Sequence, residues 1–143
     1  MSSHYEVVFS LFLREDTPVG VLDELRWHLG LSPERPEDRA VEYGEQPVLL
    51  PHSQTYLPGS ETATLRHQYR WTLRGIDEYS WGLHVRLYWL DDHWADVWWQ
   101  VVYWLAPYAD DGYAGFVREV ASDQPTLLVI HDGQPDIREY DES

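Results

Sequence analysis

The stretch from Thr62 to Leu90 reads TATLRHQYRWTLRGIDEYSWGLHVRLYWL and alternates apolar with polar residues over most of its length. Alternation with a period of two indicates strands with one buried face, and the interruption at Gly75-Ile76-Asp77 indicates a turn. The pattern predicts an antiparallel hairpin of strands 62–74 and 79–90. The face expected to be buried carries Ala63, Leu65, His67, Tyr69, Trp71, Leu73, Tyr79, Trp81, Leu83, Val85, Leu87 and Trp89.

The segment before this hairpin predicts a strand and a helix. Residues 5–13 alternate in the same way, and Asp16-Thr17-Pro18 is a typical helix start, an N-cap residue followed by proline. Apolar residues at helical spacing predict a helix over 18–29, with Gly30 as its stop. The same apolar pattern returns at an offset of 76 residues, from Val85 onward, which indicates two related β-α units.

The segment after the hairpin predicts a second helix and further strands. A helical pattern covers 93–106, and residues 113–121 are typical of a strand in which Phe116 faces as Ala114 does. Short strands at 127–130 and 137–140 flank Asp132-Gly133, which is a common two-residue hairpin turn. The sequence therefore predicts more strands beyond the two β-α units.

The predicted order, β-α-β-β-α-β with a C-terminal β-hairpin extension, resembles the ferredoxin-like arrangement. That resemblance implies an α+β fold with an antiparallel sheet and two helices on one face. We expect residues 1–143 to form a single domain with a long irregular insertion at 31–61, and strands 5–13 and 79–90 to be parallel neighbours at the centre. The resemblance is one of fold alone, and it indicates no functional family because this fold hosts many functions.

Charge and composition limit the possible partners. The net charge is −15, from 25 acidic and 10 basic residues, and every basic residue is arginine. This charge argues against nonspecific binding of nucleic acid or anionic membranes and suits a basic protein partner. The chain has no cysteine, so thiolate chemistry is excluded, and no signal-like or membrane-length apolar run is present. A cytoplasmic location is expected.

The second face of the predicted sheet holds the candidate site. Five of the ten arginines fall there, at positions 14, 66, 70, 74 and 86. The sequence predicts that Arg66, Arg70 and Arg86, with His84 and Tyr88, line a surface that accepts a carboxylate or phosphate ligand. The alternative interpretation is a solvated sheet face whose arginines pair with nearby carboxylates, as antiparallel sheets often show.

Strand register determines which of these side chains meet. If Leu73 pairs with Tyr79, Arg66 lies opposite Arg86, and this like-charge pair requires a compensating anion. A shift by two residues places Arg66 opposite Tyr88 and Arg70 opposite His84. Both registers keep the same face, because only an odd shift exchanges the faces.

Motifs for catalysis, cofactors or metals are absent from the sequence. The seven histidines show no H-x-H or H-E-x-x-H spacing, and no nucleophile elbow or phosphate-binding glycine loop is present. Asp91-Asp92-His93 resembles an acid-base or metal cluster, but helix capping and compensation of the helix macrodipole by the aspartates explain it better. We predict no catalytic, cofactor or metal site.

The helix over 93–106 is apolar around most of its circumference. Its apolar arc spans roughly 220°, whereas packing on a sheet needs little more than about 100°. We therefore expect a homodimer through residues 93–106, with part of this surface touching the second subunit unless residues 31–61 cover it. The side chains concerned are Trp94, Val97, Trp99, Val102 and Trp104.

The sequence favours a non-catalytic interaction domain or small-anion-binding domain. One alternative is an acidic inhibitor or immunity-type protein that binds a basic toxin or nuclease, because charge steering and aromatic anchors favour such complexes. Another alternative is an enzyme that acts on a small anionic substrate at the arginine-lined face. All three functions stay open at this point.

Overall fold

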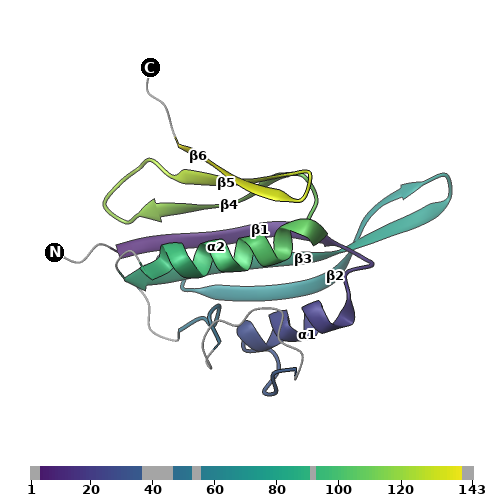
Figure 1. Ribbon diagram of the computed structural model, residues 1–143, viewed down its shortest axis with the longest axis horizontal. Coiled ribbons are helices and arrows are strands. Elements are labelled where there is room, and N and C mark those ends of the chain that lie inside the picture. Colours follow the sequence, from purple (N-terminus) through teal and green to yellow (C-terminus); the bar gives the residue numbers. More distant parts are fainter. Residues whose placement is uncertain (1–3, 37–46, 53–55, 91–92, 140–143) are drawn as a thin grey trace.

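The computed structural model describes residues 4–36, 47–52, 56–90 and 93–139, and nearly half of them form a six-stranded antiparallel sheet (Figure 1). The order across the sheet is β2-β3-β1-β4-β5-β6. The strands are β1 (His4–Arg14), β2 (Thr62–Leu73), β3 (Ile76–Leu90), β4 (Gly112–Glu119), β5 (Thr126–His131) and β6 (Gln134–Glu139). The described helices are α1 (Val19–His28), α2 (His93–Leu105) and the short 3-10 helix η1 (Ala106–Tyr108).

This architecture corrects the predicted fold class. The described chain has six antiparallel strands and only two short α-helices, so the ferredoxin-like α+β arrangement, with two helices packed on a sheet face, is wrong. Strands β1 and β3 are neighbours but run antiparallel, with Val7 opposite Leu87. The C-terminal hairpin continues the sheet because β5 pairs with the open edge of β4, where backbone groups would otherwise stay unpaired.

Strands β2 and β3 form the predicted hairpin with a tighter turn and a different register. Leu73 pairs with Ile76, and the two turn residues, Arg74 and Gly75, both have positive φ, at 53° and 77°. Two positive values are typical of the turn that matches the twist of a hairpin. Arg66 lies opposite Gly82, so both predicted registers are wrong.

A β-bulge in β2 exchanges the two faces of the hairpin beyond Tyr69. Tyr69 pairs with Tyr79, but Trp71 pairs with Glu78. Directly opposed residues share a face, so Trp71 leaves the face to which simple alternation assigns it. The hairpin also extends past the rest of the sheet (Figure 1), and its tip therefore exposes apolar side chains, those of Tyr69, Trp71, Leu73 and Ile76.

The core lies on the face of the sheet that the odd-numbered residues of β1 and β3 share. Figure 1 shows α2 lying across β1 and β3, and the core also includes side chains of α1. Its buried members include Val7, Phe9, Leu13, Val21, Leu22, Leu25, Leu83, Val85, Leu87, Val101, Val102 and Leu105. Apolar burial of this kind is the main stabilising contribution to folding. The even-numbered side chains of these strands point to the opposite face.

The ends of α1 follow the sequence signals only in part. Pro18 occupies the N-cap position without a side-chain cap, and the Thr17 hydroxyl instead donates to the Arg14 carbonyl at 2.6 Å. At the other end Gly30 has φ of 79°, and the Leu31 amide donates to the Arg26 carbonyl, so the predicted stop is confirmed. Asp91 and Asp92, predicted to cap the second helix, lie outside the described residues.

Helix α2 is covered in the single chain more than its composition predicts. Val102 is only 3% exposed, and the half-buried Trp104 packs edge-on against His28 of α1, with ring centroids 6.1 Å apart. Trp99 is half-buried as well, whereas the side chains of Trp94 and Val97 lie outside the described ones. Helix α1 thus covers part of the wide apolar arc. The homodimer through residues 93–106 stays a prediction.

The predicted insertion at 31–61 is described in part. Leu49 and Leu57 are buried, and Leu49 belongs to the core, whereas residues 37–46 and 53–55 lie outside the described ones. The acidic run at 34–45 therefore falls mostly outside the described residues. Among the helices of the described chain, none combines the length and apolar character needed to cross a membrane.

Candidate functional site

The face of the sheet opposite the core contains a hollow of about 430 Å³. This volume lies in the range typical of small-molecule sites, about 300–1,000 Å³. We call it the sheet-face hollow. It is lined by Ser10, Leu11 and Phe12 of β1, Thr64, Arg66, Gln68 and Arg70 of β2, Gly82, Leu83 and His84 of β3, and Asp110, Asp111 and Tyr113 at the start of β4.

Gly82 of β3 forms the floor of this hollow. It lies between Phe12 of β1 and Arg66 of β2, which are its partners in the two neighbouring strands. A Cβ atom at this position would lie 2.2 Å from Oε1 of Gln68 and 3.4 Å from Cε1 of Phe12. The central strand thus carries no side chain where its neighbours carry large ones, and the Gln68 carboxamide lies over Gly82 in the floor of the hollow.

A second β-bulge shapes the β4 side of the hollow. Tyr113 pairs with Val129 and Gly115 with Leu128, so β4 has one residue more than β5 over this stretch. The extra residue, Ala114, is fully buried in the core, and Tyr113 joins Phe116 on the opposite face. The prediction that Ala114 and Phe116 share a face is therefore wrong, and the bulge is what turns Tyr113 toward the hollow.

Arg70 closes one end of the hollow. Its Nη1 donates to Oδ2 of Asp110 at 2.9 Å and to the Ser80 hydroxyl at 3.3 Å. The guanidinium carbon lies 3.5 Å from the ring centroid of Phe12 and 4.7 Å from that of Trp71. A guanidinium over an aromatic face is attracted to the ring quadrupole, which holds this arginine in place. Its charge is offset by Asp110.

Arg66 and His84 differ from Arg70 because neither has an ion-pair partner within the described chain. Both side chains are exposed and line the hollow, Arg66 beside Gly82 and His84 between Thr64 and Ser10. Arginine stays protonated at every physiological pH and presents five donors in a plane. The Arg66 guanidinium is therefore a permanent positive charge in the wall of a hollow of ligand size.

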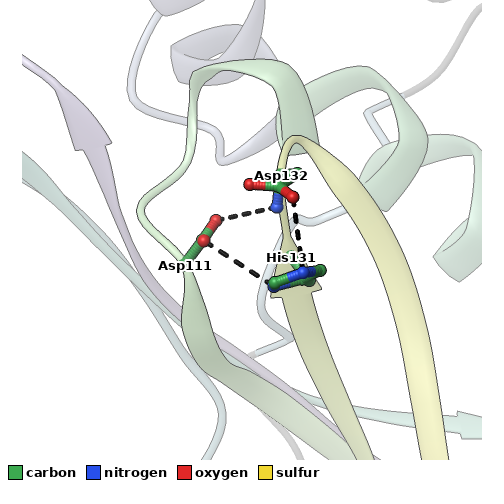
Figure 2. A group of neighbouring side chains, drawn as sticks. All are labelled: Asp111, His131 and Asp132. Atoms are coloured by element: carbon green, nitrogen blue, oxygen red, sulfur yellow. Dashed lines mark hydrogen bonds and ion pairs between the residues drawn. The ribbon is translucent and has the colours of Figure 1, made fainter.

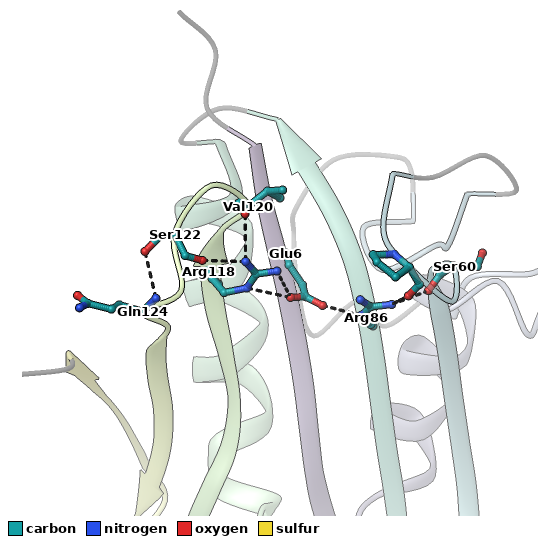
Figure 3. Close-up of polar contacts among 8 residues, drawn as sticks. Glu6, Ser60, Arg86, Arg118, Val120, Ser122 and Gln124 are labelled. Carbon is teal, nitrogen blue, oxygen red and sulfur yellow. Dashed lines mark hydrogen bonds and ion pairs between the residues drawn. The ribbon is translucent and has the colours of Figure 1, made fainter.

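Arg86 belongs to a separate polar row at the other end of the same face (Figure 3). Its Nε donates to Oε2 of Glu6 at 2.6 Å, and Arg118 donates to Oε1 of Glu6 from Nη2 at 2.9 Å and from Nε at 3.2 Å. Arg86 also donates to the carbonyls of Pro58 and Ser60. We call Glu6, Arg86 and Arg118 the closed row, because every guanidinium in it is engaged by the protein itself.

The carboxylate of Glu6 is only 6% exposed. Burial alone would raise the pKa of Glu6, but hydrogen bonds and charges from Arg86 and Arg118 outweigh it and hold the pKa below 4.5. Arg118 uses its remaining Nη1 donor on the carbonyls of Ser122 at 2.8 Å and Val120 at 3.1 Å. The closed row therefore ties β1, β3 and β4 together and offers little to a ligand.

Tyr88 also lies outside the sheet-face hollow. Its hydroxyl is hydrogen-bonded to Nδ1 of His4, its ring stacks on the His4 ring at 5.4 Å, and its amide donates to Oε1 of Glu61 at 3.1 Å. Of the five residues predicted to bind an anion, the structure brings Arg66, Arg70 and His84 to one hollow and places Arg86 and Tyr88 elsewhere. The sequence patterns did not identify Gly82 and Tyr113, because the alternation of apolar and polar residues indicates neither a glycine floor nor a β-bulge.

Asp111, His131 and Asp132 form an exposed cluster next to the hollow (Figure 2). Each offers one ligand atom within 4.8 Å of the others. Oδ1 of Asp111 accepts the Asp132 amide at 3.0 Å, and Asp132 and Gly133, with φ of 49° and 74°, form the predicted hairpin turn. These contacts explain the cluster as part of the β5–β6 turn, so we assign no ion to it.

A buried polar group lies under α1, far from the sheet-face hollow. Glu24 and His28 are fully buried, Arg35 donates to Oε1 of Glu24 at 2.9 Å, and the Val48 amide donates to Nδ1 of His28 at 3.3 Å. Burial lowers the pKa of His28 to about 4, although the nearby Glu24 charge opposes this shift and Arg35 adds to it. The group joins α1 to residues 35 and 48 of the insertion and is structural.

Comparison with protein-family models gives no match for this chain, and comparisons with curated proteins and with solved structures give none either. The function must therefore be argued from the geometry of the chain itself.

Proposed function

We propose that this protein is a non-catalytic domain that binds small anionic molecules in the sheet-face hollow. The observation that carries this proposal is Arg66, whose permanent charge lines a hollow of about 430 Å³ and has no carboxylate partner in the described chain. A charge-assisted hydrogen bond from arginine to a carboxylate or phosphate is among the stronger polar contacts in proteins. Gly82 adds no side chain of its own to the floor beside it, where the flexible Gln68 carboxamide lies.

Other groups in the hollow suit the same ligand. Gln68, Thr64 and Ser10 offer neutral donors on the walls and the floor, and Tyr113 adds a phenol whose pKa is raised by partial burial, so it stays a donor at neutral pH. A few convergent polar groups around a small hollow are typical of ligand sites. The ligand class is therefore a small carboxylate or phosphate.

Catalysis is not part of this proposal. Ser10 lies directly opposite His84 in the neighbouring strand, an arrangement with the residue types of a nucleophile and its base. Within the described chain, however, no hydrogen bond joins these two side chains and no carboxylate orients His84. An activated nucleophile needs both contacts.

The test is calorimetric titration of the purified protein with inorganic phosphate and with succinate at low ionic strength. We expect binding that weakens at least about tenfold in Arg66→Gln, because a charged hydrogen bond contributes roughly 1.5–3 kcal/mol. Arg74→Gln is the matched control, since Arg74 is equally exposed but lies in the hairpin turn outside the hollow. Equal affinities of the two variants would contradict the proposal.

Failure of every small anion to bind would favour the alternative of a basic protein partner. The exposed apolar tip of the β2–β3 hairpin, with Trp71 and Leu73, supports that alternative in a chain of net charge −15. The cytoplasmic location expected from the sequence belongs to the same proposal and is tested by cell fractionation.

A further inference from the structure

The two side walls of the sheet-face hollow carry charges of opposite sign. Arg66 lines the β2 wall and Asp111 the wall beside β4. Their neighbours Arg70 and Asp110 neutralise each other through the 2.9 Å contact. Within the described chain no carboxylate pairs with Arg66, and Asp111 has only the exposed imidazole of His131, at 3.8 Å, as an ion-pair partner.

The distance between these two walls follows from the spacing of the paired strands. Arg66 pairs with Gly82, Gly82 with Phe12, and the Asp110 amide donates to the Phe12 carbonyl at 2.9 Å. Three strand spacings of about 4.8 Å separate the backbones at the two ends of this row by about 14 Å. Asp111 follows Asp110 directly, and together with the volume of about 430 Å³ this span suits a molecule of a few carbon atoms.

Asp111 is held in position while its carboxylate stays accessible. Figure 2 shows it beside the β5–β6 turn, where Oδ1 accepts the Asp132 amide at 3.0 Å and Oδ2 lies 3.8 Å from Nδ1 of His131. Its side chain is still 56% exposed. A carboxylate has about four lone-pair sites, so the contact to the turn leaves acceptors for an ammonium group.

We infer that the ligand of this hollow is a zwitterion, a small molecule with an ammonium group at one end and a carboxylate or phosphate at the other. The inference rests on the proposed function, since it adds a second contact to the same site. Arg66 binds the anionic end and Asp111 the cationic end. An anion without an ammonium group leaves Asp111 unpaired and in repulsion with it, and such a mismatch is a common source of specificity.

Matched pairs of ligands test this inference. We would titrate the full chain at low ionic strength with 6-aminohexanoate against hexanoate, 4-aminobutanoate against butanoate, and O-phosphoethanolamine against inorganic phosphate. In at least one pair the amine-bearing member should bind about tenfold more tightly or better, since one charge-assisted contact accounts for that factor. Asp111→Asn should abolish this preference by weakening the amine-bearing ligand, and it should leave the plain anion bound at least as tightly as before, because the repulsion is removed too.

Asp132→Asn is the control, because Asp132 lies in the same cluster but does not line the hollow, and asparagine tolerates its positive φ. This variant should keep the preference for amine-bearing ligands. Equal binding within every pair would overturn the zwitterion inference and leave the anion site standing. A preference that persists in Asp111→Asn would overturn the role of Asp111. Absence of binding by all six compounds would overturn both proposals.

Discussion

Two groups of arginines lie on the same face of the same sheet, and they differ in what surrounds them. In the closed row, Arg86 and Arg118 flank the buried carboxylate of Glu6 and also use backbone carbonyls (Figure 3). In the sheet-face hollow, Arg66 lies opposite Gly82, which has no side chain, and it has no carboxylate partner within the described chain. The same residue type thus serves the fold in one place and remains available to a ligand in the other.

Strand register, and not composition, decides the role of an arginine on this sheet. Glu6 lies opposite Arg118 in β4 and two positions from Val8, the partner of Arg86 in β3, so both guanidinium groups reach it. Arg66 has Gly82 as its neighbour across the hairpin, and the next residue along that row is Phe12. Neither Gly82 nor Phe12 has a side-chain acceptor for the Arg66 guanidinium.

Removing the shared carboxylate of the closed row should have the largest effect. Glu6→Gln leaves Arg86 and Arg118 with their charges uncompensated at a partly buried position. Loss of one partner from such a buried pair costs about 3 kcal/mol of unfolding free energy. Urea denaturation at pH 7 measures this loss, and Glu78→Gln, at an exposed carboxylate of β3, should change little. Equal stability of wild type and Glu6→Gln would contradict a structural role for the row.

As the pH is lowered, the loss of stability from His28 should begin before the loss from Glu6 in the closed row. The folded pKa of His28, about 4, lies below the ordinary 6.5, so the unfolded chain binds more protons between these values. The contribution of His28 to stability is full above pH 6.5 and is lost as pH falls toward 4, by on the order of 3 kcal/mol. The Glu6 carboxylate also contributes stability that is lost as pH falls below 4.5, because its pKa is lowered in the folded state.

Urea denaturation at a series of pH values between 7 and 4 measures this loss. His28→Asn should flatten the dependence in this window, because it removes the titrating ring and keeps an acceptor near the Val48 amide. His131→Asn, at an exposed histidine of the β5–β6 turn, should leave the slope as it is. A slope that survives in His28→Asn would refute the assignment.

Filling the floor of the hollow should change stability least and binding most. In Gly82→Ala the new methyl group displaces the flexible end of Gln68 and touches Phe12, so unfolding free energy should change by less than about 1 kcal/mol. Affinity for the anions named above should fall at least about tenfold, since the methyl group and the displaced Gln68 side chain take up space beside Arg66. Gly20→Ala, where nothing lies within 4 Å, should leave affinity unchanged. Unchanged affinity in Gly82→Ala would show that the ligand does not bind beside Gly82.

Much of the local structure follows from patterns in the sequence. Alternation predicts β1, β2 and β3 within a few residues. Gly30 ends α1 and Asp132-Gly133 forms the β5–β6 turn, both as predicted. These signals work because each depends on neighbours in sequence, on side-chain periodicity or on the backbone freedom of one residue. The candidate site follows in part, since Arg66, Arg70 and His84 do share a hollow.

The rest could not be predicted because it depends on distant partners. The bulges at Tyr69–Trp71 and Tyr113–Gly115 each exchange a face of the sheet, and both arise where strands with different neighbours must stay paired. The direction of β3 relative to β1 and the extension of the sheet by β5 have the same origin. A pattern within one strand carries no information about which edge it joins.

The sequence alone was therefore sufficient to locate most strands and helices, the apolar face of β1 and β3, and the gathering of arginines on the other face. The tertiary structure was needed to pair Arg86 with Glu6, to place Arg66 opposite Gly82, and to bring Asp111 to the same hollow as Arg66. The physical reason is that periodicity is a property of a few consecutive residues. Charge compensation depends on the register between strands far apart in the chain.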